Sequence, residues 1–286
     1  MDHVRWQNRP QLRRPVLIAA FEGWNDGADA ASTAVRYLRD RWSARPFATI
    51  DPEEFHDFTV TRPQVRLVQG ITRRIEWPET ELSAAALPGT SRDVIALLGH
   101  EPQLKWRTFS EEIVQVATEL RVELIVILGA LLADVAHTRP VRVTGTAADA
   151  ELVRRLGLGR STYEGPTGIV GVLHDAFRRA HLPSASLWAA VPHYVGSTPS
   201  PKAALALVER AADLLSTTVV TEDLQIAAAD YERQVSEVVA RDDDIAAYVH
   251  RLESTADDED VADMEIVTGE ALAAELERYL REQRED

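Results

Sequence analysis

Short, continuously apolar segments separated by amphipathic stretches constrain this chain more than any other feature of its sequence. Residues 16–21, 94–98 and 124–128 are apolar at nearly every position instead of alternating with polar residues. Such segments are typical of strands that helices cover on both faces. The other strands that we expect are shorter or more polar, at residues 47–50, 65–68, 73–77, 141–144 and 186–191.

Helical patterns, with apolar residues three and four positions apart, lie between these strands at residues 30–42, 108–120, 148–156, 168–180 and 201–215. Strands that alternate with helices predict an α/β fold, a three-layer α/β/α domain with a largely parallel sheet. Residues 46–78 contain closely spaced strands and no helix, which indicates an antiparallel insertion or an edge of the sheet. We expect this domain to span residues 1–221.

A different pattern begins at Glu222 and predicts a helical C-terminal appendage over residues 222–286. Its apolar residues step by three and four positions, as in the seam of a coiled coil or a helical hairpin. The three consecutive aspartates at 242–244 predict a turn between two helices, because aspartates cap helix starts. An acidic linker at 257–263 and a last helix at 269–281 complete the expected appendage.

The charge of the chain is concentrated in this appendage. The formal net charge is −15, yet residues 1–221 hold 25 basic and 25 acidic residues, whereas residues 222–286 hold 6 basic and 21 acidic ones. Like charge argues against nucleic acid and anionic membranes as partners. The acidic segment is then either a solvated helical surface or a docking surface for a basic partner.

The chain contains no cysteine, which excludes disulfides, thiolate nucleophiles and cysteine-bound zinc and fits a reducing compartment. The polar N-terminal residues 1–15 do not resemble a signal peptide, and the most apolar run, 124–133, is too short to span a bilayer. We therefore expect a cytoplasmic protein without a membrane partner.

Polar residues follow the first predicted strand, in a loop with two glycines. Glu22, Asn25 and Asp26 lie where the carboxyl end of a strand leads into a helix, the usual place for ligands in open α/β sheets. The loop either holds a ligand near the helix amides or is a tight turn in which Asp26 or Asp29 caps the helix.

Two further loops carry candidate side chains. His100 and Glu101 follow the strand at 94–98 and suit acid–base chemistry, with a purely structural turn as the alternative. Asp134 and His137 follow the strand at 124–128 and could form a base with its orienting carboxylate, or two metal ligands with His193 as a third. The alternative is a polar loop in which Arg139 pairs with Asp134.

The last candidates are Glu164 and Thr167, in a glycine-containing loop before the helix that starts near Ile169, where Thr167 is a natural N-cap. The sequence contains no dinucleotide fingerprint, Walker loop, nucleophile elbow or HExxH motif. We therefore predict no cofactor and no metal, and we assign no catalytic nucleophile.

Five of these segments, taken in order, resemble the proteasome assembly chaperone family in its bacterial, actinobacterial branch. They are residues 15–32 (PVLIAAFEGWNDGADAAS), 99–113, 128–145, 163–177 and 186–195. The resemblance implies a phosphorylase/hydrolase-like α/β/α fold and self-association as a homo-oligomer, such as a trimer. It also implies proteasome subunits as partners, since the eukaryotic relatives act as a pair that helps α-subunits assemble into a ring.

Some of those chaperones insert a C-terminal hydrophobic–tyrosine–any tripeptide into pockets of the ring, whereas this sequence ends in Arg284, Glu285 and Asp286. A non-catalytic protein-binding or assembly factor is the function that we expect first. The alternative is an enzyme, hydrolase-like or phosphorylase-like, with a polar pocket at the carboxyl ends of the strands. A purely oligomeric scaffold is the third hypothesis.

Overall fold

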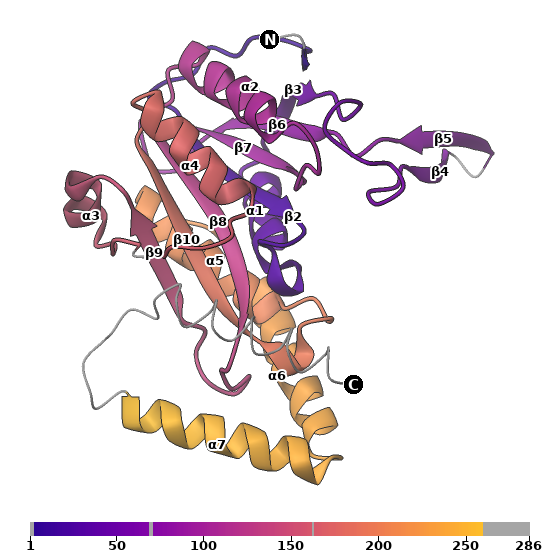
Figure 1. Ribbon diagram of the computed structural model, residues 1–286, viewed down its shortest axis with the longest axis vertical. Helices are drawn as coiled ribbons and strands as arrows, with labels where there is room; N and C mark the ends of the chain where they lie inside the picture. Colours follow the sequence, from indigo (N-terminus) through magenta and orange to yellow (C-terminus); the bar gives the residue numbers. More distant parts are fainter. Residues whose placement is uncertain (1–2, 69–70, 162, 260–286) are drawn as a thin grey trace.

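The computed structural model describes residues 3–68, 71–161 and 163–259, which contain an eight-stranded mixed sheet (Figure 1). The strand order is β1-β3-β6-β7-β2-β8-β10-β9. The four middle strands run parallel: β7 (Asp93–His100), β2 (Val16–Glu22), β8 (Leu124–Ala133) and β10 (Ser184–Pro192). The outer strands are antiparallel to their neighbours: β1 (Val4–Trp6), β3 (Arg45–Ile50), β6 (Thr80–Ala86) and β9 (Val143–Ala147).

The sheet is therefore parallel in its centre and antiparallel at both sides, so the expectation of a largely parallel sheet was too broad. Parallel neighbours need a long crossover between them, whereas β6 reaches β7 through residues 87–92 alone. Strand β6 and the three-residue β1 were not predicted from the sequence. In the β6 sequence, TELSAAA, Thr80 is the one residue of a type that favours strands, and three alanines follow at its end.

Helices cover both faces of the sheet and give the three layers that the sequence predicts. One face packs against α1 (Ala30–Arg41), α3 (Ala150–Leu156) and α5 (Pro201–Leu215), and the other against α2 (Trp106–Glu119) and α4 (Ile169–Arg179). Ile18 belongs to the apolar core under α1, α3 and α5, its neighbour Leu17 belongs to the core under α2 and α4, and both are fully buried. Burial on both faces explains why the middle strands are apolar at every position.

Between β3 and β6 the chain forms a separate hairpin that projects from the body of the domain (Figure 1). Its strands, β4 (Gln64–Val68) and β5 (Thr72–Glu76), pair only with each other in the described sheets. The antiparallel insertion predicted for residues 46–78 is thus confirmed.

The described part of the C-terminal segment forms two helices, α6 (Glu222–Val239) and α7 (Asp243–Glu259). The carboxylate of Asp242 accepts hydrogen bonds from the amides of Asp244 and Ile245, at 3.0 and 3.1 Å, so the predicted turn between two helices is confirmed. The predicted acidic linker is wrong for residues 257–259, which continue α7, because extending an existing helix by a few residues needs no new nucleus. The rest of the linker and the helix predicted at 269–281 lie outside the described residues.

Helix α6 packs along α5, and its Leu224 joins the core beneath α1 and α5. Tyr231, Val235 and Val239 of α6 form a smaller apolar cluster with Val249 of α7. Among the helices described, none combines the length and apolar character needed to cross a membrane.

Candidate functional site

The four parallel strands have their carboxyl ends at one edge of the sheet, here called the carboxyl edge. Most of the predicted site residues lie at these strand ends or in the loops that follow them. The register of β2 and β7 places Glu22 directly opposite His100. The Glu22 Oε2 atom lies 3.1 Å from His100 Nδ1, and its Oε1 atom accepts a hydrogen bond from Arg36 Nη2 at 2.6 Å. His100 therefore pairs with a carboxylate from the neighbouring strand.

Glu101 ties two loops at this edge to the start of α4. Its Oε1 atom accepts hydrogen bonds from Asn25 Nδ2 at 2.9 Å and from the backbone amide of Ile169 at 2.8 Å. The first amides of a helix have no intrahelical partner and favour a negative charge. The prediction that Thr167 caps this helix is wrong: Gly168 is the N-cap residue without a side-chain cap, Thr167 is exposed, and Glu101 supplies the acceptor.

Asp26 performs the same task at the start of α1. Its Oδ1 atom accepts hydrogen bonds from the amides of Ala31 at 2.6 Å and Ser32 at 3.2 Å, whereas its buried Oδ2 atom has no hydrogen-bond partner among the described residues. Burial raises the pKa of the Asp26 carboxyl to about 6, against the opposing effect of its hydrogen bonds with Ser32 and Ala31. The structural interpretation of this loop, with Asp26 as the cap, is the one that the geometry shows.

Asp134 and His193 lie together against the C-terminal helices. The Asp134 Oδ1 atom is 3.0 Å from His193 Nδ1 and also accepts a hydrogen bond from the hydroxyl of Tyr248 in α7. The rings of His193 and Tyr248 meet edge to face with centroids 5.5 Å apart. Asp134 thus joins the end of β10 to α7.

His137 is buried, and its hydrogen bonds fix both ring nitrogens. Its Nε2 lies 2.9 Å from Ser236 Oγ, which itself donates to the carbonyl of Glu232 at 2.8 Å, so Nε2 must carry the proton. Nδ1 then accepts from the Tyr194 hydroxyl at 2.8 Å, and that hydroxyl oxygen accepts the backbone amide of His137 at 2.8 Å. Burial lowers the pKa of His137, in keeping with this neutral ring.

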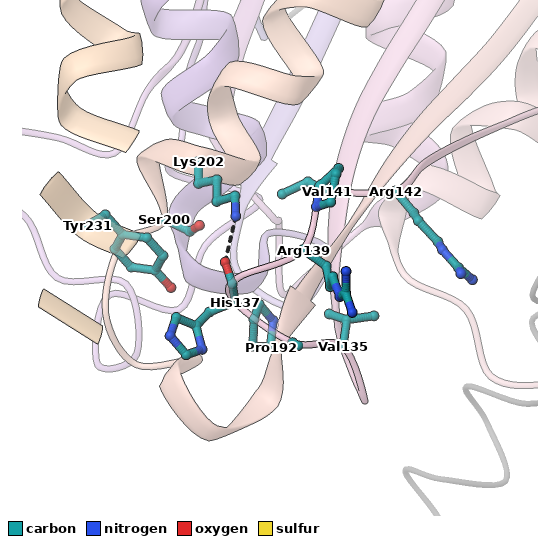
Figure 2. Close-up of a pocket in the computed structure, with 11 residues that line it drawn as sticks. Val135, His137, Arg139, Val141, Arg142, Pro192, Ser200, Lys202 and Tyr231 are labelled. Atoms are coloured by element: carbon teal, nitrogen blue, oxygen red, sulfur yellow. Dashed lines mark hydrogen bonds between the residues drawn. The ribbon is translucent and has the colours of Figure 1, made fainter. Parts of the chain in front are cut away.

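The carbonyl of His137 completes the link to the rest of the domain (Figure 2). Lys202 Nζ donates to this carbonyl at 2.6 Å and to Glu232 Oε2 at 2.5 Å, which connects α5, the loop after β8 and α6. The pocket drawn in Figure 2 has a volume of about 20 Å³, room for about one water molecule. Tyr231 of α6 and Ser200, the N-cap residue of α5, are among its lining residues.

Since both nitrogens of His137 are occupied by protein partners, the hypothesis that Asp134, His137 and His193 are three metal ligands is wrong. Within the described part of the chain, no group of three histidine, aspartate or glutamate side chains is placed to hold a metal ion. The His137 contacts come instead from Tyr194 and Ser236, which the sequence analysis did not single out. A polar residue beside the apolar seam of α6 was the available signal for Ser236.

The ten candidates thus fall into two hydrogen-bonded groups and two exposed positions. The first group lies at the ends of β2 and β7 and comprises Glu22, Asn25, Asp26, His100 and Glu101. The second lies beneath α6 and α7 and comprises Asp134, His137 and His193. Glu164 and Thr167 are exposed in the loop before α4. That all ten line one pocket remains a prediction.

Two solved structures from actinobacteria are similar to this chain over most of its length. A PAC2 family protein from Streptomyces avermitilis is 47% identical, with a TM-score of 0.77, and the match covers 82% of this chain and 99% of that one. A proteasome-assembly chaperone homologue from Mycobacterium tuberculosis has the same identity and coverage and a TM-score of 0.74. A comparison with curated proteins gave no match.

An archaeal proteasome activator from Pyrococcus furiosus shares the fold at 17% identity, with a TM-score of 0.67 over 83% of this chain and 99% of that one. The model of the PAC2 family matches residues 20–239. That match spans the whole carboxyl edge and helix α6, which confirms the resemblance drawn from the sequence. The chain belongs to the PAC2 family.

Proposed function

We propose that this protein is a non-catalytic assembly factor of the cytoplasm that binds proteasome subunits and associates with itself, as a trimer or another homo-oligomer. The similarity to a Mycobacterium tuberculosis protein described as a proteasome-assembly chaperone homologue supports proteasome-related partners. In this proposal residues 1–221 form the α/β/α body and residues 222–286 its helical appendage.

The observation that carries the proposal is that the polar side chains at the carboxyl edge hydrogen-bond to other parts of the fold. Glu101 and Asp26 bind the first amides of α4 and α1, and His137 binds Tyr194 and Ser236. Each of these groups holds two elements of the fold together. A catalytic acid or base has to reach a substrate proton instead. The geometry therefore favours a rigid surface that binds protein over a reaction centre.

Native mass spectrometry of the purified protein, alone and mixed with α-type proteasome subunits from the same organism, tests the proposal. We expect a homo-oligomer for the protein alone and a complex of defined stoichiometry in the mixture. A matched mixture of the subunits with an unrelated acidic protein controls for nonspecific charge attraction. Absence of a complex with the α-subunits under conditions where both proteins are folded would refute the proposed partner.

Three single variants locate the contact. Glu22→Gln and His100→Asn change the solvent-facing part of the carboxyl edge, where both side chains are partly exposed, while Glu111→Gln changes an exposed position on α2. If the carboxyl edge binds the subunits, the first two variants weaken the complex and the third does not. Equal affinities for all three would place the contact elsewhere.

A further inference from the structure

The projecting hairpin of β4 and β5 has one apolar face that is open to solvent. Val65 lies opposite Ile75, and Leu67 lies opposite Arg73, so these four side chains share a face. Val65, Leu67 and Ile75 are 63%, 62% and 54% exposed. Three large apolar side chains on one exposed face are characteristic of a protein interface rather than of an isolated surface position.

The opposite face of the hairpin is mostly polar, with Val68 as its apolar side chain among the described residues. Arg66 lies directly opposite Arg74, and Arg66 forms an ion pair with Glu76. Like charges placed opposite each other destabilise a strand pair. Across its described residues the hairpin carries three arginines and one glutamate, and Arg73 is the arginine that lies on the apolar face. A partner that covers this face therefore has to accommodate a positive charge.

A two-stranded sheet on its own is at best marginally stable in water, and both outer edges of this hairpin have no strand partner among the described residues. At its base Trp77 packs on Phe58, with ring centroids 4.9 Å apart, but every residue of β4 and β5 is exposed. These features are those of a hairpin that is stabilised by contact with a binding partner.

The same chain carries a surface of complementary character at the turn between α6 and α7, residues 238–245, here called the acidic turn. Val238 and Ile245 are exposed there by 57% and 36%, next to the exposed carboxylates of Asp243 and Asp244. The hairpin and the acidic turn lie toward opposite ends of the long axis of the molecule (Figure 1). One copy therefore cannot bring its own two surfaces together.

We infer that the β4–β5 hairpin of one copy docks its apolar face on the acidic turn of a second copy, with Arg73, which lies on that face, beside Asp243 and Asp244. This inference rests on the self-association proposed above and names its interface. The charges select this pairing, since two hairpins facing each other would oppose arginine with arginine. A contact between two different surfaces is heterologous and forms a ring when the rotation between copies closes.

Charge exchange between the two surfaces tests the inference. The oligomer mass and dissociation constant are measured by native mass spectrometry and sedimentation velocity for four proteins: wild type, Arg73→Glu, Asp243→Arg with Asp244→Arg, and the combination of all three changes. We expect Arg73→Glu and the aspartate double variant each to raise the dissociation constant about tenfold, and the combined variant to recover wild-type association. Arg154→Glu, at an exposed position of α3, is the matched control and should not alter association.

A second variant examines the apolar contact without any change of charge. Val65→Ser with Leu67→Ser is expected to weaken association about a hundredfold, because two exposed side chains would lose their buried contact in the oligomer. Circular dichroism checks that the α/β body remains folded. Hairpin variants that leave the oligomer unchanged would overturn the inference while the proposed self-association stands, and a monomeric wild type would overturn both. Weakened association without recovery in the combined variant would overturn the acidic turn as the occupant.

Discussion

Replacement of Asp26 by asparagine should make the stability of the protein less dependent on pH. Burial raises the pKa of the Asp26 carboxyl to about 6 in the folded protein, compared with about 4 for an exposed aspartate. The folded state therefore binds this proton more tightly than the unfolded state does. The stability that this proton contributes is complete below about pH 4 and is lost as the pH rises through about 6.

The size of the effect follows from the two pKa values. One pKa unit corresponds to about 1.4 kcal/mol, so the wild-type free energy of unfolding should fall by up to about 3 kcal/mol across this range because of Asp26 alone. Asparagine does not titrate, and it keeps an oxygen that can accept from Ala31 and Ser32. The difference between Asp26→Asn and wild type should grow by the same amount from about pH 4 to pH 7.

Urea unfolding at several pH values, followed by tryptophan fluorescence, measures this difference. Any constant cost of the buried amide group cancels, because only the change with pH is compared. Asp213→Asn, at an exposed position of α5, controls for the removal of one negative charge. A difference that stays level with pH, or that shrinks as the pH rises, would refute the reasoning. It would mean that the amides of α1 stabilise the carboxylate more than burial destabilises it.

Three further substitutions probe single contacts. Glu101→Ala should lower the free energy of unfolding by about 2–4 kcal/mol in urea denaturation, because it leaves the Asn25 side-chain amide and the Ile169 backbone amide without their acceptor. Glu111→Ala, on the exposed side of α2, should have little effect. His137→Ala should speed amide hydrogen exchange in α6 and α7 relative to α2, since it removes the bonds to Tyr194 and Ser236. His250→Ala, exposed on α7, is its control, and equal exchange in both variants would contradict the role of His137. Gly129→Ala should cost about 1–3 kcal/mol in thermal unfolding, because a Cβ atom there would lie 2.4 Å from the Trp188 ring; an unchanged melting temperature would show that the ring can move aside.

The sequence alone was sufficient for the layers of the fold. Residues 16–21, 94–98 and 124–128 are apolar at every position, so a strand made of them presents apolar side chains on both of its faces. Such a strand has to be covered from both sides. The turn at Asp242 was equally readable, because an aspartate that caps a helix start acts on amides two and three residues away. Both signals are local.

The partners of the candidate residues were decided only in three dimensions. His137 meets Ser236, 99 positions along the chain, and Glu101 meets Ile169, 68 positions away. Neither pair leaves a mark in its neighbouring sequence, since a histidine or a glutamate in a loop suits a catalytic site and a structural bond equally well. Local patterns report which side chains are buried, whereas the choice of hydrogen-bond partner depends on how α4 and α6 pack against loops that are remote in sequence.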